Sequence, residues 1–525
     1  MEDYIIHNIT IYDGTGKPGY SGSLTFSGDR ITGVYASPEI DIPACHEISG
    51  KGLCAAPGFV DTHTHSDLYL LHDGRQPSSI TQGVTTEILG QDGLSYAPLS
   101  LNNLKDYVRY IKGLNGQFED VPLDFTTAGE YLEHFRGKTA VNVAWLVPHC
   151  ALRLETVGFE NRLMSLSELS KARQMVQEAM DQGARGFSTG LSYFPSAFSN
   201  TEELIEICKA VKEKDGVYVT HLRTVFQGKP FDNVEEALNI ARYSGVKLHF
   251  SHYRTGGDTI GHTEKIMEKI DRGIQEGLDI TLELYPYPYG ASYAPMFIPP
   301  WANDGGFDAI MERLANTESR KKIAEYIDRE FSAFNGMITY SGNHEELMGR
   351  TFSELAKEHG VRKGTIIAEL LYSEELALSF HDVDPRLNEE QTRCFHRDLL
   401  ELLSRPNYMV GSDAIHVGKY PHPRAWGSFA KLLRLAREER FPLERLINRM
   451  TDLPCQRFRL TDRGRLQKGY YADLVLFYPM TVTDRATIEN PRLAAAGIQY
   501  VFVNGHLALQ QGKPVGNLAG RVIKH

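Results

Sequence analysis

The segment from Gly58 to His65 has the clearest chemical meaning, because an apolar run there ends in two histidines, His63 and His65. Side chains two positions apart on a strand point to the same face, so both imidazoles would point the same way where that strand ends. Two imidazoles placed like this form a natural ligand pair for a divalent metal. The alternative is a pair of exposed turn histidines, which is common in a chain with 19 histidines.

Three further residues follow short apolar segments in the same way. His221 and His252 each come just after a strand pattern, and Asp413 follows an apolar run that ends in Gly-Ser. Taken singly, such histidines are more often structural hydrogen-bonding residues, and Asp413 could equally cap a helix. His249 is expected to face elsewhere, because it lies an odd number of residues from His252. A metal site therefore requires a fold that brings these residues together.

The elements that would position them alternate along the middle of the chain. Short apolar strand patterns cover residues 58–61, 86–89, 142–148, 186–188, 218–220, 248–251, 281–285 and 408–412. Helical patterns between them include residues 165–182, 201–214, 234–243 and 263–276, and Ser165 with Glu168 has the spacing of a capping box. This alternation predicts the α/β class and, most simply, a (β/α)8 TIM-like barrel. Such a barrel closes its eighth strand onto its first, which would bring His63, His65, His221, His252 and Asp413 to one end.

Two regions do not fit the alternation. The interval from Tyr285 to Tyr408 far exceeds the roughly 40 residues that one βα unit needs, so we expect a helical insertion after strand 7 at about residues 302–400. Both chain ends read as strands, and Asn504-Gly505 is a typical hairpin turn. We expect a small β-sandwich domain from residues 1–56 and 460–525, with the barrel at residues 57–459.

The composition restricts the class of protein. The chain has 525 residues, with 42% hydrophobic and 23% charged, which is typical of a globular protein and excludes disordered, collagen-like and coiled-coil chains. A net charge of −11 argues against a nucleic-acid partner. No apolar run approaches the ~20 residues that span a bilayer, so no membrane association is expected. The six cysteines form no CxxC pair and no signal peptide is evident, which predicts reduced thiols and a cytoplasmic location.

The convergence of these histidines and Asp413, with a small β domain built from both termini, resembles the amidohydrolase superfamily. Several segments narrow the resemblance to the D-aminoacylase (N-acyl-D-amino-acid deacylase) family, and it covers essentially the whole chain. These segments are 186–195 (GFSTGLSYFP), 285–287 (YPY), 299–302 (PPWA), 411–413 (GSD), 422–427 (HPRAWG), 462–464 (DRG) and 469–477 (GYYADLVLF).

The resemblance implies a set of roles. His63 and His65 would bind one divalent metal, His221 and His252 a neighbouring one, and Asp413 would act as the base and acid and also as a ligand. Zinc is the first expectation, at one or two ions per chain, with manganese or another divalent ion as the alternative. The family's relatives also make a homo-oligomer an expectation.

One departure from the family concerns the residue after strand 2. The family commonly has a cysteine ligand in a Gly-Asn-Cys-Gly setting, whereas this chain has Gly90-Gln91-Asp92-Gly93, which puts Asp92 in the ligand position. A carboxylate can bind zinc and can bridge two metals, but it is a harder ligand and makes manganese more plausible. The alternative is a simple turn residue, because Asp-Gly is a common turn pair. Strand 4 offers no lysine for the carbamylated bridge of some relatives.

The expected function is metal-dependent hydrolysis of the amide bond of N-acyl-D-amino acids. Asp413 would take a proton from the attacking water and pass it to the departing nitrogen. Arg223, Arg254, where the family often has lysine, and Arg424 are candidates to receive the substrate carboxylate, because a guanidinium binds a carboxylate through two bonds. Tyr285, Ser292 and His149 are further candidates for substrate binding. Two alternatives stay open: a cyclic-amide hydrolase of hydantoinase, dihydropyrimidinase or lactamase type, and an inactive barrel that serves as a binding scaffold.

Overall fold

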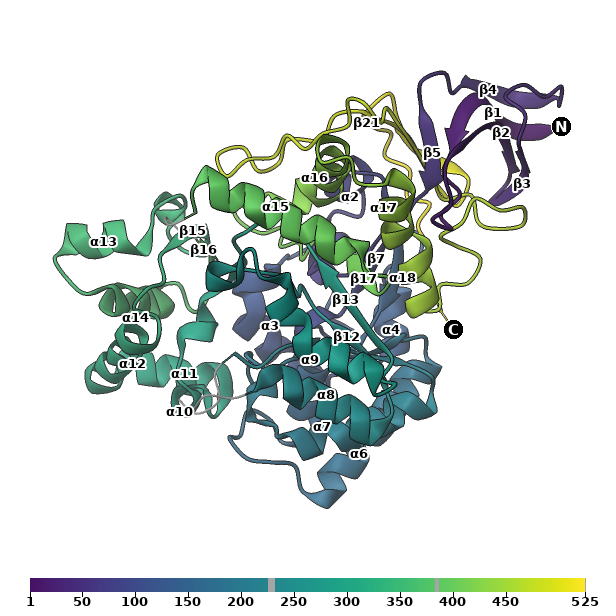
Figure 1. Ribbon diagram of the computed structural model, residues 1–525. Coiled ribbons are helices and arrows are strands. Elements are labelled where there is room, and N and C mark those ends of the chain that lie inside the picture. Colours follow the sequence, from purple (N-terminus) through teal and green to yellow (C-terminus); the bar gives the residue numbers. More distant parts are fainter. Residues whose placement is uncertain (225–231, 383–386, 525) are drawn as a thin grey trace.

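A closed barrel of parallel strands forms the centre of the computed structural model, which describes residues 1–224, 232–382 and 387–524 (Figure 1). Its strands, in chain order and in order around the barrel, are β6 (Phe59–Asp61), β7 (Val84–Leu89), β8 (Asn142–Trp145) continued by β9 (Val147–Pro148), β10 (Gly186–Gly190), β11 (Val217–His221), β12 (Lys247–Phe250), β13 (Ile280–Leu284) and β17 (Tyr408–Val410). The barrel closes where Thr62 N donates to Val410 O at 3.3 Å and Asp413 N donates to His63 O at 2.8 Å. The predicted TIM-like barrel is thereby confirmed.

The helices follow the strands as the periodicity predicts. They include α6 (Leu166–Asp181), α7 (Thr201–Glu213), α8 (Asn233–Ser244) and α9 (Thr263–Gln275), which pack outside the sheet (Figure 1). The capping box is present at α6, because the Ser165 side chain accepts from Glu168 N and the Glu168 side chain accepts from Ser165 N. Among the described residues, no helix is both long and apolar enough to cross a bilayer.

A nine-stranded sheet combines the two ends of the chain (Figure 1). It consists of β1 (Glu2–Ile11), β2 (Tyr20–Ser27), β3 (Arg30–Tyr35), β4 (Ala44–Ser49) and β5 (Cys54–Pro57) with β18 (Leu474–Phe477), β19 (Ile498–Val503), β20 (His506–Gln510) and β21 (Lys513–Pro514). The ring of Phe502 on β19 lies 5.0 Å from that of Phe26 on β2, although three strands separate β19 from β2 in the sheet. The sheet therefore folds over onto itself as a sandwich, and the domain boundaries given above remain a proposal.

The segment between β13 and β17 extends away from the terminal sheet (Figure 1). It contains α10 (Pro300–Asn303), α11 (Gly306–Ala315), α12 (Thr317–Glu330), α13 (Phe352–His359) and α14 (Lys363–Ser373). It also contains a three-stranded antiparallel sheet, which the helical patterns did not predict, of β14 (Ala291–Tyr293), β16 (Leu378–Asp382) and β15 (Gly336–Ser341). The last helix, α15 (Glu389–Ser404), packs against α9 and β17 as a barrel helix does. The insertion is therefore a mixed structure at the carboxyl ends of the strands.

A buried polar network joins the terminal sheet to the barrel. Asp473 pairs with Arg463, accepts from Asn504 N at 2.7 Å, and accepts from the side chain of Asn142 on β8 at 3.2 Å. The Arg463 side chain also donates to Asn504 Oδ1 at 2.7 Å. Because the Arg463 and Asp473 side chains are each only 5% exposed, the loss of one charge would leave the other uncompensated.

We expect Arg463→Met to lower the free energy of unfolding by about 3–5 kcal/mol, because Asp473 would then be a buried charge without its cation. Chemical denaturation followed by fluorescence measures this. The matched control is Arg136→Met, which breaks a pair with Glu133 that is 79% and 53% exposed and should cost at most ~1 kcal/mol. Equal losses in the two variants would contradict a structural role for the junction.

Candidate metal centre

Six potential ligands lie at the carboxyl ends of five barrel strands. His63 and His65 follow β6, Asp92 lies in the turn η1 (Gln91–Gly93) after β7, His221 ends β11, His252 follows β12, and Asp413 follows β17. The parallel order of the strands explains why residues so distant in the sequence meet, since all carboxyl ends open at the same mouth of the barrel.

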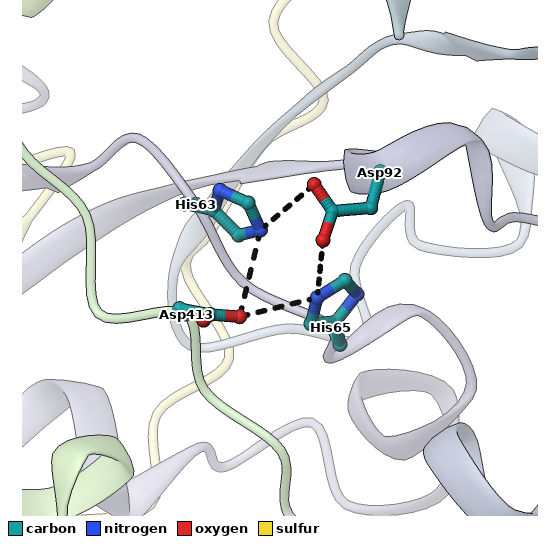
Figure 2. A group of neighbouring side chains, drawn as sticks. All are labelled: His63, His65, Asp92 and Asp413. Atoms are coloured by element: carbon teal, nitrogen blue, oxygen red, sulfur yellow. Dashed lines mark ion pairs between the residues drawn. The ribbon is translucent and has the colours of Figure 1, made fainter. Parts of the chain in front are cut away.

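The first group consists of His63, His65, Asp92 and Asp413, all of them buried (Figure 2). His63 Nε2 lies 3.6 Å from Asp92 Oδ1 and 3.6 Å from Asp413 Oδ1. His65 Nε2 lies 3.6 Å from Asp92 Oδ2 and 3.3 Å from Asp413 Oδ1. Two imidazoles and two carboxylates thus face one point from opposite sides.

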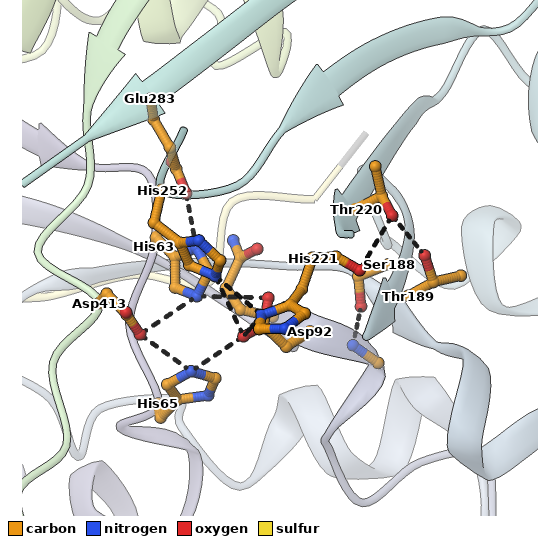
Figure 3. A network of polar contacts seen from close by, with 12 residues as sticks. His63, His65, Asp92, Ser188, Thr189, Thr220, His221, His252, Glu283 and Asp413 are labelled. Atoms are coloured by element: carbon orange, nitrogen blue, oxygen red, sulfur yellow. Dashed lines mark hydrogen bonds and ion pairs between the residues drawn. The ribbon is translucent and has the colours of Figure 1, made fainter. Parts of the chain in front are cut away.

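The second group consists of His221, His252 and the same Asp92 (Figure 3). Asp92 Oδ2 lies 3.4 Å from His221 Nδ1 and 3.7 Å from His252 Nε2, and these two ring nitrogens are 3.0 Å apart. Asp92 is therefore the residue that the two groups have in common, with its carboxylate between them.

The backbone around Asp92 explains how the carboxylate reaches this position. Asp92 has φ 54° and ψ 25° in the left-handed region, which aspartate tolerates better than most residues. The hydroxyl of Ser188 on β10 holds the turn, because it donates to Gly90 O and accepts from Gly93 N at 3.0 Å. A Cβ at Gly190 would lie 2.2 Å from Asp92 O, so only glycine lets β10 approach the turn this closely.

A glutamate that the sequence analysis missed supports the first group from behind. Glu283, one residue before the carboxyl end of β13, accepts a hydrogen bond from His63 Nδ1 at 2.5 Å (Figure 3) and another from Thr62. His249 Nε2 lies 3.2 Å from the other oxygen of Glu283, so His249 does face away from the ligands, as predicted. Because Nδ1 of His63 carries the proton, the lone pair of Nε2 is directed at the centre. The signal in the sequence that could have identified Glu283 was an acidic residue within a short strand whose other residues are Ile280, Thr281, Leu282 and Leu284.

The charges at the centre reinforce one another. Burial opposes the ionisation of Asp413, but the Arg424 guanidinium, 2.7 Å from Asp413 Oδ2, and the nearby imidazoles hold the pKa of Asp413 at about 2. Burial likewise opposes the charge of Asp92, yet His63 and His221 lower its pKa well below the usual range. Burial disfavours a charged His65, but Asp413 and Asp92 raise its pKa to about 9. The carboxylates thus stay ionised and attract positive charge.

The donor atoms fit a divalent metal ion. Two ligands about 2.0–2.1 Å from a tetrahedral ion lie roughly 3.3–3.4 Å apart, close to the 3.3–3.6 Å between nitrogen and oxygen atoms in the first group. His63 Nε2 and Asp92 Oδ1 are buried without a hydrogen-bond partner, an arrangement that a metal bond would satisfy. The two groups combine imidazole nitrogens with carboxylate oxygens, which suit zinc and also manganese.

A cavity of about 260 Å³ opens over these residues, and three of the predicted substrate-binding residues line it: Tyr285, Ser292 and Arg424. Arg254 lies next to it, because its guanidinium donates to Tyr285 OH at 2.8 Å and lies 4.4 Å from the centre of the Tyr285 ring. The Arg424 guanidinium lies 4.8 Å from the same ring. Two cations therefore meet at Tyr285, beside Asp413.

The other two predicted substrate-binding residues do not line this cavity. Arg223 turns to α8, where its guanidinium pairs with both oxygens of Glu236 at 3.0 and 3.1 Å and also bonds Ser199 O. His149 lies beneath the surface, 3.4 Å from Glu203. Both side chains are buried, and a buried charge or imidazole requires such partners. In this structure, therefore, neither Arg223 nor His149 reaches the cavity over the metal ligands.

Comparisons with known proteins agree with this geometry. A model described as "Amidohydrolase family" matches residues 46–508. The chain belongs to this family. It is 33% identical to the D-aminoacylase of Alcaligenes xylosoxydans xylosoxydans, over 99% of this chain and 97% of that enzyme. It is also 33% identical to the N-acyl-D-aspartate deacylase of the same organism, over 96% and 91%. The crystal structure of the N-acyl-D-glutamate deacylase of Bordetella bronchiseptica, complexed with zinc and a phosphonate inhibitor, is 30% identical, with a TM-score of 0.83 and full coverage of both chains.

We expect Glu283→Gln to weaken metal binding about 10–100-fold, because the neutral amide no longer fixes the orientation and basicity of His63. Competition with a chromophoric chelator measures the dissociation constant. The control Glu374→Gln changes another buried glutamate, which accepts from Ser341 and Asn343 in the insertion, and should leave metal affinity unchanged. If both variants retain the wild-type affinity, Glu283 does not support the metal.

Proposed function

We propose that this protein is a metal-dependent hydrolase that cleaves the amide bond of N-acyl-D-amino acids. The observation that carries this proposal is the sharing of the Asp92 carboxylate by a buried and a half-buried pair of histidines, at the mouth of a barrel that also presents Asp413. The family relatives include enzymes named D-aminoacylase, N-acyl-D-aspartate deacylase and N-acyl-D-glutamate deacylase, which supports the substrate class.

His63, His65, Asp92 and Asp413 would hold one metal ion, and His221 and His252 would hold a second with Asp92 between the two. A divalent ion, zinc or a harder ion such as manganese, supplies the Lewis acidity that makes water a nucleophile at neutral pH and polarises the acyl carbonyl. A histidine binds a metal as a neutral imidazole. A bound ion would therefore replace the proton on His65 as the positive charge that stabilises Asp92 and Asp413.

Asp413 performs the proton transfers. Its Oδ1 faces the centre, 3.3 Å from His65 Nε2, while Arg424 binds its Oδ2 and keeps the carboxylate ionised, which is the form a base requires. Asp413 takes a proton from the water molecule as the oxygen of that water attacks the acyl carbonyl carbon. It then returns this proton to the nitrogen as the carbon–nitrogen bond breaks, so that the amine leaves in neutral form.

The substrate carboxylate binds where the two guanidinium groups meet. The guanidinium groups of Arg254 and Arg424 lie 4.4 and 4.8 Å from the centre of the Tyr285 ring, and Ser292 lines the same cavity as Tyr285 and Arg424. A guanidinium can bind a carboxylate through two parallel hydrogen bonds, which fixes the substrate relative to Asp413. This orientation would hold the scissile amide over the metal ligands.

The two alternatives make different demands. A cyclic-amide hydrolase uses the same metal chemistry, so only its substrates separate it from the deacylase. A binding scaffold has no need of six converging ligands and an ionised Asp413.

We also propose that the enzyme resides in the cytoplasm and assembles with copies of itself. Size-exclusion chromatography with light scattering measures the assembly.

The wild-type enzyme should hydrolyse N-acetyl-D-leucine much faster than its L enantiomer and should leave hydantoin intact. We expect Asp413→Asn to lower kcat by about 10²–10⁴-fold, a much larger effect than on metal content, because it removes the proton-transfer group while His63, His65 and Asp92 remain as ligands. Ninhydrin detection of the free amino acid and elemental analysis measure both quantities. Opening of hydantoin without deacylation would favour the cyclic-amide alternative, and absence of both metal and turnover would favour the scaffold.

A second experiment tests Asp92 as the shared ligand. We expect the metal content of Asp92→Ala to fall from two ions per chain to one or none, with loss of activity, because both groups lose an oxygen donor. The control Asp398→Ala removes another buried aspartate, one that accepts from Thr255 and Gly261, and should keep the wild-type metal content. Unchanged metal in Asp92→Ala would exclude Asp92 as a ligand.

A further inference from the structure

A second and larger cavity, of about 490 Å³, adjoins the one over the metal centre. Its walls come from the loop after β10, which contributes Leu191, Phe194 and Ala197, and from the insertion, which contributes Ile298 and Trp301 among others. Trp301 is 44% exposed there, while Leu191 and Ile298 are almost fully buried. A cavity of this size, with an apolar part formed by these side chains, matches the ~300–1,000 Å³ of typical small-molecule sites.

The two cavities meet, since Ser192, Thr224 and Met296 line both. His221 lies in the same region, because it ends β11 and its ring is 4.9 Å from that of Tyr193 in the loop after β10. A substrate positioned at the metal ligands can therefore extend past Ser192 into the larger cavity.

The position of the larger cavity around the barrel indicates which end of the substrate enters it. Ser192 follows β10, whereas Asp413 and Arg424 follow β17, and four steps separate β10 from β17 in either direction around the barrel. If the substrate carboxylate lies at Arg424 and Tyr285, the part beyond the scissile carbonyl points towards β10. That part is the acyl group.

The charged residues that line the cavity, Lys322, Glu325, Arg329 and Glu330, all lie on α12 and comprise two cations and two anions. On α12, Arg329 Nε lies 2.7 Å from Glu330 Oε1, and Lys322 Nζ lies 3.6 Å from Glu318 Oε1. The lining charges therefore sum to zero, so the rim does not select an anionic or a cationic occupant. Its apolar walls favour a neutral hydrocarbon or aromatic group.

We propose that the larger cavity is an acyl-binding subsite for long or aromatic acyl groups, so that the preferred substrates are N-acyl-D-amino acids with an acyl chain well beyond acetyl. This inference rests on the proposed function and specifies its substrate class. The 260 Å³ cavity receives the amino-acid part, and the 490 Å³ cavity receives the acyl chain. The acyl group leaves as a free carboxylic acid once water adds to its carbonyl carbon and the nitrogen departs with a proton.

The experiment compares kcat/KM for N-acetyl-D-leucine, N-octanoyl-D-leucine and N-acetyl-D-2-aminodecanoic acid in the metal-loaded, full-length enzyme. The wild type should prefer the octanoyl substrate by at least about tenfold, because each methylene group in an apolar pocket strengthens transition-state binding. Trp301→Ala should remove about tenfold from the octanoyl substrate, mainly through KM. It should leave N-acetyl-D-leucine within about twofold, because Trp301 lines only the larger cavity.

Two further variants make the test specific. Ala197→Phe fills the cavity from the opposite wall and should abolish the octanoyl preference even if Trp301→Ala folds poorly. The control Tyr372→Ala removes a similarly exposed aromatic residue, 42% exposed on α14 and outside both cavities, and should change no substrate.

The outcomes separate the subsite from the proposed function. Hydrolysis of N-acetyl-D-leucine without an octanoyl preference, or an equal loss on all substrates in Trp301→Ala, would overturn the subsite and leave the deacylase intact. A loss confined to N-acetyl-D-2-aminodecanoic acid would assign the cavity to the amino-acid side chain and overturn the inference. Hydrolysis of none of the three substrates would overturn the proposed function and the subsite with it.

Discussion

The charge of one buried carboxylate organises the functional end of this molecule. Asp92 lies out of water between His63 and His65 on one side and His221 and His252 on the other. A buried carboxylate is costly without positive charge beside it, so the imidazoles and any cation they bind must compensate it. The left-handed turn, the Ser188 hydroxyl that holds it and the absence of a side chain at Gly190 all follow from the need to place this one group.

The barrel fixes the positions of the metal ligands, because they lie at the ends of its rigid strands. A separate set of residues orients their side chains. Glu283 lies behind His63 and determines which of its nitrogens is free, and His249 lies beside the other oxygen of Glu283. At the end of the barrel opposite the ligands, Arg457 donates to Asp279 O at 3.1 Å just before β13 begins. Phe458 packs there in a buried cluster with residues of the barrel strands, such as Val60 and Val219. The chemistry can therefore change at the mouth without disturbing the packing that holds the strands.

The residue pattern predicted the parts of this structure that depend on local periodicity. The eight strand patterns correspond to the barrel strands, and residues after those strands converge because parallel topology allows little else. Glu283 escaped notice because its partners, Thr62 and His63, are more than 200 positions away. Arg223 pairs with Glu236, only 13 positions further along on α8, but no short motif marks that pairing in the sequence. Resemblance to the family, rather than periodicity, singled out Asp92.

Overall sequence identity does not distinguish the substrates of the relatives. The chain is 33% identical both to a D-aminoacylase and to an N-acyl-D-aspartate deacylase, although their names specify different substrates. In this chain, the residues that can adapt to a substrate without changing the metal ligands are those in the walls of the cavity. Here the insertion provides those walls through Met296, Ile298 and Trp301, none of which contributes to the metal groups. Because the insertion packs on the mouth of the barrel and none of its described residues forms a barrel strand, its residues can vary to suit a new acyl group while the barrel keeps the ligands in place.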